Sequence, residues 1–168
     1  MFEKCAITTN RIQAIIEDKA YKKYYKKNTE AEKKREFCKH DMTHFMDVAR
    51  IAIILNEKAG GVADEELIYA TALLHDIGRF KQYEKSIPHE QASAELAPDI
   101  LVRCGFDSDE SAKIVKAILE HRNKEVKDEL SLAGLIYRAD KLSRPCFACA
   151  AQKNCNWKDD KKNLVIKI

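Results

Sequence analysis

The stretch Leu-Leu-His-Asp-Ile-Gly at residues 73–78 combines residue types that can bind a metal ion. A neutral imidazole next to a carboxylate, here His75 and Asp76, offers two ligands to a divalent cation. The apolar residues before the pair place its charge at the edge of a core. An unpaired aspartate is costly there, and a bound cation is one of the few partners that offset this cost. The pair is therefore a candidate metal site.

Four further residues stand near the apolar face or at the end of an expected helix, and they are His44, His89, His121 and Asp140. Taken singly, each is an ordinary core or surface residue. Taken together, they place one His or Asp on each of several successive helices, as a metal site in the core of a helical bundle requires. A second pair, His40–Asp41, lies in a polar run. We expect it on the surface, with a supporting role behind the ligands as the alternative.

The elements expected to position these residues are helices. The chain has only five glycines and three prolines, and it lacks runs of alternating β-branched residues, so we predict an all-α fold. Capping residues and apolar spacing indicate the helix positions. We expect one or two helices over residues 9–36, then helices over 39–58, from 64 to the His-Asp pair, from 89 onward, over 107–121, and over 132–140.

The bulk properties restrict the class of protein. A chain of 168 residues is one domain by length, and a net charge of +3 does not by itself indicate a nucleic-acid partner. Charged residues interrupt the first twenty positions, and no apolar stretch is long enough to span a membrane. Six cysteines without a secretory signal favour reduced thiols, so we expect a cytoplasmic protein.

The first 36 residues form a basic segment in which lysines alternate with tyrosines, most densely at 19–27. This composition suits a surface that contacts phosphates or RNA. The simpler interpretation, which we favour, is a solvated helix face, because Glu30, Glu32 and Glu36 dilute the charge.

Within residues 37–144 the motifs resemble one family. Phe-Met-Asp-Val-Ala follows His44, Arg79 follows the His-Asp motif, Pro-His-Glu-Gln-Ala-Ser-Ala-Glu surrounds residue 89, and Ala-Asp-Lys-Leu stands at 139–142. In this order they are similar to the motifs of the HD-domain metal-dependent phosphohydrolase superfamily. The resemblance implies an all-α helical bundle with a metal site in its core. Residues 1–168 would form a single HD domain with its core at 37–144.

The resemblance also implies a set of metal ligands. Asp76 would bridge two ions in binuclear members, and the other ligands would be His44, His75 and Asp140 on one ion and His89 and His121 on the other. The cofactor would be one or two divalent ions of iron, manganese, zinc, nickel or magnesium. The chain departs from the cyclic-dinucleotide phosphodiesterase branch, because Arg122 follows His121 where that branch has a second histidine, and a Gly-Tyr-Pro signature is absent from the sequence.

A metal held in this way activates water and polarises a phosphoryl oxygen, while cationic side chains neutralise the departing phosphate. Arg79, Lys141 and, less strongly, Arg122 are candidates for that role because each stands beside a ligand. We predict hydrolysis of a small phosphorylated molecule, with a nucleotide as the favoured substrate and Asp76, Lys141 and Arg79 as catalytic residues. The alternatives are a di-iron oxygenase of the same superfamily and a non-catalytic nucleotide- or RNA-binding module.

The C-terminal tail, residues 145–168, carries Cys146, Cys149 and Cys155. A Cys-x-x-Cys pair with a third nearby thiol can bind zinc or an iron–sulfur cluster if a fourth ligand comes from elsewhere. Cys5, Cys38 and Cys104 are the cysteines that could supply it. The alternative is that these are ordinary reduced thiols.

Overall fold

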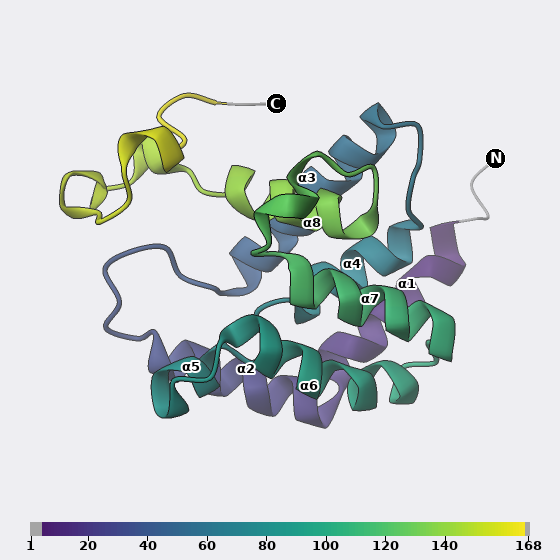
Figure 1. Cartoon of the computed structure of the whole chain (residues 1–168). Helices are drawn as coiled ribbons and strands as arrows, with labels where there is room; N and C mark the ends of the chain where they lie inside the picture. Colours follow the sequence, from purple (N-terminus) through teal and green to yellow (C-terminus); the bar gives the residue numbers. More distant parts are fainter. Residues whose placement is uncertain (1–4, 167–168) are drawn as a thin grey trace.

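The computed structural model describes the backbone of residues 5–166 and the side chains of residues 11–166, and this part of the chain is all-helical without a strand. Figure 1 shows the helices arranged around the central helix α4. Their bounds are α1 Cys5–Glu17, α2 Lys19–Ala31, α3 Met42–Lys58, α4 Glu65–Leu74, α5 Arg79–Lys85, α6 His89–Arg103, α7 Ser108–Glu120 and α8 Leu132–Leu142. A short 3₁₀ helix follows α7, and three more lie in the tail. The predicted all-α fold class is confirmed.

Side-chain caps explain where several of these helices begin. Asp41 accepts a hydrogen bond from the backbone of α3, Asp64 from that of α4, and Ser131 from that of α8. At α7 the Asp107 side chain and the Glu110 side chain cap each other's backbone, which is a full capping box. These caps satisfy amide groups that the first helical turn leaves without partners. They lie within a residue or two of the positions that the sequence predicts.

Two apolar clusters meet at α4, which is buried along most of its length. One cluster joins α4 to α1, α6 and α7, and the other joins it to α3 and α8. In Figure 1, α3 and α8 lie above α4, while α2, α5 and α6 lie below it. The C-terminal end of α4 therefore opens between two layers of helices, and the His-Asp pair lies at that end.

The segment 9–36, expected to form one or two helices, contains two that are divided at Asp18, whose side chain caps α2. One local feature differs from the sequence-based expectation. The short helix α5 directly follows the His-Asp turn and was not predicted, because its seven residues are too few to show a clear apolar period. It begins with Arg79, one of the residues predicted to face phosphate.

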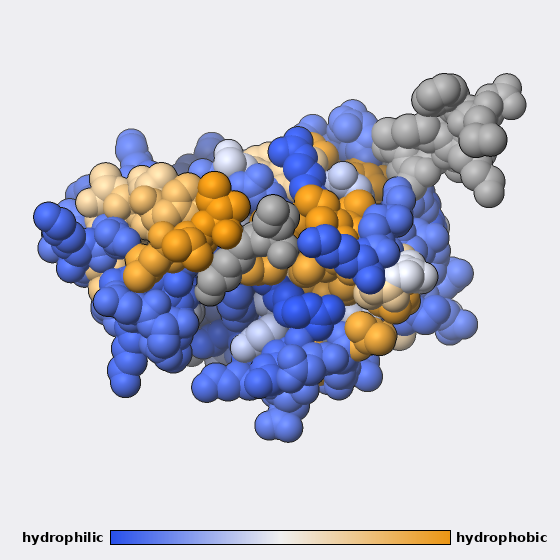
Figure 2. Space-filling model, turned by 90° about the horizontal axis from the view of Figure 1, so that it is seen from above, coloured by the Kyte–Doolittle hydropathy of each residue, from blue (hydrophilic) through white to orange (hydrophobic). Residues whose placement is uncertain are grey.

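On the face seen in Figure 2, hydrophilic side chains predominate and apolar side chains gather in patches. The exposed large apolar residues of the tail are Phe147, Trp157, Leu164, Val165 and Ile166. Among the residues that the structure describes, no helix is long and apolar enough to cross a membrane. Because these apolar side chains of the tail are exposed, the tail packs more loosely than the helices before it.

Candidate metal centre

The His-Asp pair lies in a tight turn that begins where α4 ends. His75 caps α4, and residues 76–78 connect it to α5. The buried side chain of Asn28 holds this turn from α2, because its amide donates to the carbonyl of Asp76 at 2.9 Å and its oxygen accepts from the amide of Phe80 at 2.7 Å. A turn fixed at both ends keeps the two ligand candidates in one orientation.

Gly78 allows this turn to press directly against α6. Its amide donates to the Ser93 hydroxyl at 2.9 Å. A Cβ atom at this position would lie 2.5 Å from the backbone carbon of Ala92 and 2.5 Å from the backbone nitrogen of Ser93. Because these neighbours are backbone atoms, they cannot move aside cheaply. Residue 78 must therefore be glycine, because its backbone lies against that of α6. This contact brings α6, which carries His89, close to His75 and Asp76.

Asp76 lies between two groups of histidines. Its Oδ1 atom is 3.2 Å from His89 Nε2 and 3.7 Å from His121 Nε2. Its Oδ2 atom is 3.6 Å from His75 Nε2 and 3.7 Å from His40 Nε2. Each carboxylate oxygen thus faces its own set of imidazole nitrogens, as a carboxylate bridging two cations would require.

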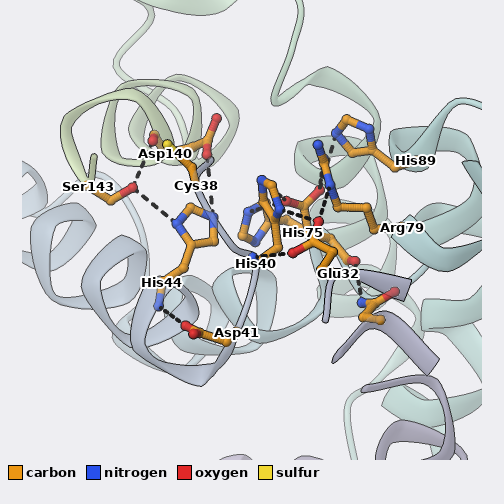
Figure 3. Close-up of polar contacts among 12 residues, drawn as sticks. Glu32, Cys38, His40, Asp41, His44, His75, Arg79, His89, Asp140 and Ser143 are labelled. Carbon is orange, nitrogen blue, oxygen red and sulfur yellow. Dashed lines mark hydrogen bonds and ion pairs between the residues drawn. The ribbon is translucent and has the colours of Figure 1, made fainter. Parts of the chain in front are cut away.

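The potential ligands form overlapping clusters in which one atom from each residue lies within 4.8 Å of the others. The clusters are His44 with His75 and Asp140, Asp76 with His89 and His121, and His40 with His44 and Asp76. Figure 3 shows His44 and Asp140 on one side of His75, with His89 and Arg79 on the other. The structure therefore brings together all six residues predicted as metal ligands.

Main-chain hydrogen bonds orient two of these imidazoles. His75 Nδ1 lies 2.7 Å from the carbonyl oxygen of Ala72, and His121 Nδ1 lies 2.6 Å from that of Ile118. A carbonyl oxygen can only accept, so Nδ1 carries the proton and Nε2 keeps its lone pair. Histidines that ligate metals are held in this way.

His44 and His89 are oriented by side chains, which also contact the Nδ1 atom of each imidazole. His89 Nδ1 is 2.5 Å from Gln82 Oε1, and His44 Nδ1 is 3.3 Å from the hydroxyl of Ser143. The inward-facing Nε2 atoms of His44 and His75, together with Asp76 Oδ1, are buried and have no hydrogen-bond partner. Buried polar atoms are rarely left without partners, and divalent cations bound at the two histidine groups would satisfy these three. The residues present therefore fit a metal.

The electrostatics of the cluster produce ligands in the correct protonation state. Burial lowers the pKa of His44 and of His89 to about 3, and that of His121 to about 4, so these imidazoles are neutral near pH 7. Burial alone would raise the pKa of Asp76, but His75, His40 and other neighbouring charges hold it well below its ordinary value. Neutral imidazoles beside an ionised carboxylate are what a divalent ion binds.

His40 is not part of a surface pair, so that expectation is wrong. Its side chain is only 12% exposed, and its ring extends inward with Nδ1 2.8 Å from Glu32 Oε1. Its partner Asp41 is the N-cap of α3. The loop around residue 40 keeps Cys38 and Lys39 exposed but turns the His40 ring inward, which local composition could not indicate.

Glu32 is a buried carboxylate that the sequence reading assigned to a solvated face. It is 4% exposed and contacts His40, Arg79 and the Tyr83 hydroxyl. Burial opposes its ionisation, but the hydrogen bond and charge of His40 outweigh it and lower the pKa of Glu32 to about 2. Glu32 thus anchors two side chains that face Asp76.

Comparisons with known proteins support the same centre. The sequence model of the HD-domain family matches residues 41–144 of this chain. The chain belongs to the HD-domain family.

Two relatives agree with this assignment. Over 157 residues the chain is 45% identical to an uncharacterized protein of Clostridium beijerinckii. The aligned region covers 94% of this chain and 98% of that protein. Over 107 residues it is 32% identical to ribonuclease Y of Oleidesulfovibrio alaskensis, covering 64% of this chain but only 18% of ribonuclease Y. No solved structure is significantly similar to the chain. The predicted resemblance to the HD superfamily, whose members are mostly metal-dependent hydrolases, is confirmed.

We call the cluster of His44, His75, Asp76, His89, His121 and Asp140 the HD centre. A cavity of about 660 Å³ adjoins it and is lined by Asp76, His89, His121 and Asp140. Its other charged lining residues are one acid, Asp160, and nine bases from the helices, the loops and the tail. The bases are Arg35, Arg79, Arg122, Lys124, Arg138, Lys141, Arg144, Lys161 and Lys162. A hollow with this excess of positive charge favours an anionic ligand.

Three of these bases were predicted to face phosphate, and their surroundings differ. Arg79 contacts Glu32 at 3.2 Å and Asp76 at 3.6 Å, and it is only 13% exposed. Lys141 Nζ lies 2.8 Å from Asp140 Oδ2 and is 31% exposed. Arg122 is 53% exposed and pairs with Glu90. All three line the cavity, but Arg79 and Lys141 are the ones tied to the carboxylates of the HD centre.

The tail cysteines lie outside the HD centre. Cys146, Cys149 and Cys155 line a second, small cavity together with Cys38 from the loop before α3. Cys104 is buried in the apolar core instead, and the side chain of Cys5 lies outside the described residues. Of the proposed fourth partners, the structure places Cys38 beside the other three.

Proposed function

We propose that this HD domain hydrolyses a phosphorylated small molecule in a metal-dependent reaction, with a nucleotide as the favoured substrate. The observation that carries the proposal is the position of Asp76. Its two oxygens face separate histidine groups beside a cavity lined by nine basic side chains. A bridged metal pair next to a basic cavity suits transfer of a phosphoryl group to water.

The ligand sets of this proposal are those that the family resemblance implies, and two of the clusters support them. His44, His75 and Asp140 would hold one cation, His89 and His121 would hold the other, and Asp76 would contact both. A divalent cation bound there supplies an activated water and neutralises charge on a phosphoryl oxygen. Iron, manganese, zinc, nickel and magnesium all accept some combination of these ligands.

Arg79 and Lys141 would bind and orient the phosphate. Arg79 is held from two sides by carboxylates, so its guanidinium enters the cavity with little freedom left to lose. Lys141 donates to Asp140 and to the carbonyl of His121, and its third N–H remains for a phosphate oxygen. Positive charge placed in advance stabilises the developing charge of the transition state.

Two aromatic residues of the cavity wall favour a nucleotide among phosphorylated molecules. Tyr137 and Trp157 both line the cavity, and each has a basic side chain over its ring. Arg144 lies 4.2 Å from the ring centre of Trp157, and Lys141 lies 4.3 Å from that of Tyr137. Aromatic faces beside cations suit a base and its phosphate.

The test is a turnover screen of metal-loaded protein with nucleoside mono-, di- and triphosphates and with a simple phosphomonoester. We expect phosphate release with manganese under anaerobic conditions, and we expect Asp76→Asn to abolish it. The matched control is Asp99→Asn, an exposed carboxylate on α6 that should leave turnover unchanged.

Other outcomes would replace the proposal. Turnover that requires iron and oxygen would identify a di-iron oxygenase, which the same six-ligand order permits. Steeply salt-dependent binding of RNA without any product would identify a non-catalytic module. An oligoribonucleotide belongs in the screen because the chain is similar to part of ribonuclease Y.

A further inference from the structure

Four cysteines from two distant segments converge on one small cavity beside the HD centre. Cys38 comes from the loop before α3, and Cys146, Cys149 and Cys155 come from the tail. The cavity measures about 20 Å³, and four of its seven lining residues are these cysteines. Cys38 lies more than one hundred positions before the others in the sequence, so the fold brings it to the tail.

We infer that Cys38, Cys146, Cys149 and Cys155 form a zinc-binding site that is separate from the HD centre. Four thiolates complete a closed tetrahedral site of the structural type, without a position left for water or substrate. The inference is independent of the reaction that the HD centre catalyses. It extends the predicted three-thiol tail site by assigning its fourth ligand.

The backbone around the tail cysteines suits a single ion, and metal analysis distinguishes this from an iron–sulfur cluster. Cys149 closes a turn by donating its amide to the carbonyl of Cys146 at 3.3 Å, so both thiols leave one compact turn.

Two basic side chains lie where they would offset the charge of bound thiolates. Zinc with four thiolates carries a net negative charge, which nearby cations would offset. Lys162 lines the cysteine cavity itself, and the positive charge of Arg144 opposes the burial that raises the pKa of the Cys38 thiol. Both bases also line the larger cavity of the HD centre, so the two cavities share a wall.

The thiols face one cavity without being drawn together. In the described part of the chain, every group of three ligand atoms within 4.8 Å belongs to the HD centre, so the sulfur atoms are still spread around the cavity. Binding of zinc would pull the tail toward Cys38. The tail carries Trp157 and Lys161 of the substrate cavity, so this closure would fix one wall of that cavity.

Metal analysis of protein purified without added metal tests the assignment. The HD ligands can also bind zinc, so the experiment uses a His75→Ala/Asp76→Ala background. We expect about one zinc per chain in this background, as a closed tetrathiolate site requires. Adding Cys38→Ser or Cys149→Ser should remove most of that zinc. Cys38 is exposed, so its substitution should not prevent folding.

The control is Cys104→Ala in the same background. Cys104 is buried in the core away from the cavity, so the protein with this substitution should keep its zinc. Zinc that persists after Cys38→Ser but is lost with Cys149→Ser would overturn the four-ligand site. Protein that contains iron and sulfide in place of zinc would overturn the choice of metal. Absence of zinc from the background variant would overturn the site altogether.

A second readout uses the tryptophan of the tail. Trp157 is the only tryptophan in the sequence, and Arg144 lies over its ring. We expect chelation of zinc to increase quenching of its fluorescence by iodide and to shift its emission to longer wavelength, because the tail loosens. Cys38→Ser should show this spectrum without chelator. An unchanged spectrum in both cases would contradict closure of the tail by zinc.

Discussion

The HD centre and the cysteine cavity are two clusters of candidate metal ligands built on different supports. The ligands of the HD centre come from helices or their ends, and an oxygen atom fixes each imidazole at Nδ1. The cysteines come from a loop and from short turns, and their thiols are partly exposed. A buried helical frame organises its ligands before metal arrives, whereas turns leave much of that organisation to the metal.

This difference predicts different responses to metal loss. The HD centre should keep its shape, because apolar packing around α4 holds it independently of any ion. The tail has few buried apolar residues and should loosen. The predictions below test that contrast.

Substitution of Asp76 should have the largest effect. Asp76→Asn removes the charge that faces both histidine groups, so we expect metal-dependent turnover to fall by at least ~100-fold, since even groups behind the ligands cost roughly 10–100-fold. The helical content by circular dichroism should remain. Loss of folding would show instead that the frame depends on the ion.

Glu32 should support the HD centre from behind. Glu32→Gln keeps the shape but removes the charge that holds His40 and Arg79, so we expect metal affinity to fall by roughly 10–100-fold. Titration calorimetry measures the change. Glu30→Gln is the matched control on the same helix, because that side chain is 64% exposed. Equal affinities for the two variants would remove Glu32 from the centre.

Gly78 tests whether packing sets the geometry of the pair. Gly78→Ala places a methyl group against the backbone of α6, so we expect unfolding free energy to fall by about 1–3 kcal/mol. Metal affinity should fall with it. Gly61→Ala also strains a backbone at φ 77°, but it meets no atoms within 4 Å, so only stability should change. Urea denaturation and calorimetry separate these outcomes.

Limited proteolysis compares the two regions directly. After metal removal by a chelator, we expect trypsin to cleave faster at Lys153 and Lys158 in the tail, while the lysines of α7 stay protected. Cys38→Ser should cleave as fast as chelated wild type even when metal is present. Faster cleavage throughout the chain would mean that the helical frame also depends on metal.

The smallest expected effect concerns Arg11, which joins α1 to Glu66 on α4 and to Glu110 on α7. Arg11→Ala should lower stability by about 1 kcal/mol and leave metal content unchanged. Hydrogen bonding to Arg11 lowers the pKa of Glu110. The difference from wild type is therefore full above the ordinary glutamate pKa of 4.5 and shrinks as pH falls below it.

Sequence reading predicted the helices that carry strong local signals. Asp64, Asp107 and the glycines at 60–61 mark helix ends by chemistry that acts within a few residues, so those ends were predictable. The ordered set of ligand candidates was predictable because its motifs resemble those of one family. Locally, His75, His121 and Asp140 stand at or near the ends of apolar helices, whereas His44 and His89 stand in the first turns of theirs. Whether they bind metal remains a prediction that the geometry supports.

The missed residues depend on contacts that local sequence does not encode. Asn28 and Glu32 are one turn apart, and they continue the face of α2 that buries Tyr21. Polar side chains on that face were the available signal, since a buried polar group needs a partner. The abundance of lysine in the segment obscured it. The inward position of His40 depends on how the loop crosses the site, and no local pattern predicts that.

The main-chain anchoring of His75 and His121 also bears on how the sequence can change over time. Their proton positions are set by the carbonyl oxygens of Ala72 and Ile118, three residues earlier in the same helical turn. Every amino acid provides a carbonyl oxygen, so any replacement that preserves the helix also preserves the tautomer. The inner ligands are therefore tolerant of drift at their supporting positions. His44 and His89 depend on the side chains of Ser143 and Gln82, and substitutions there would have to be matched.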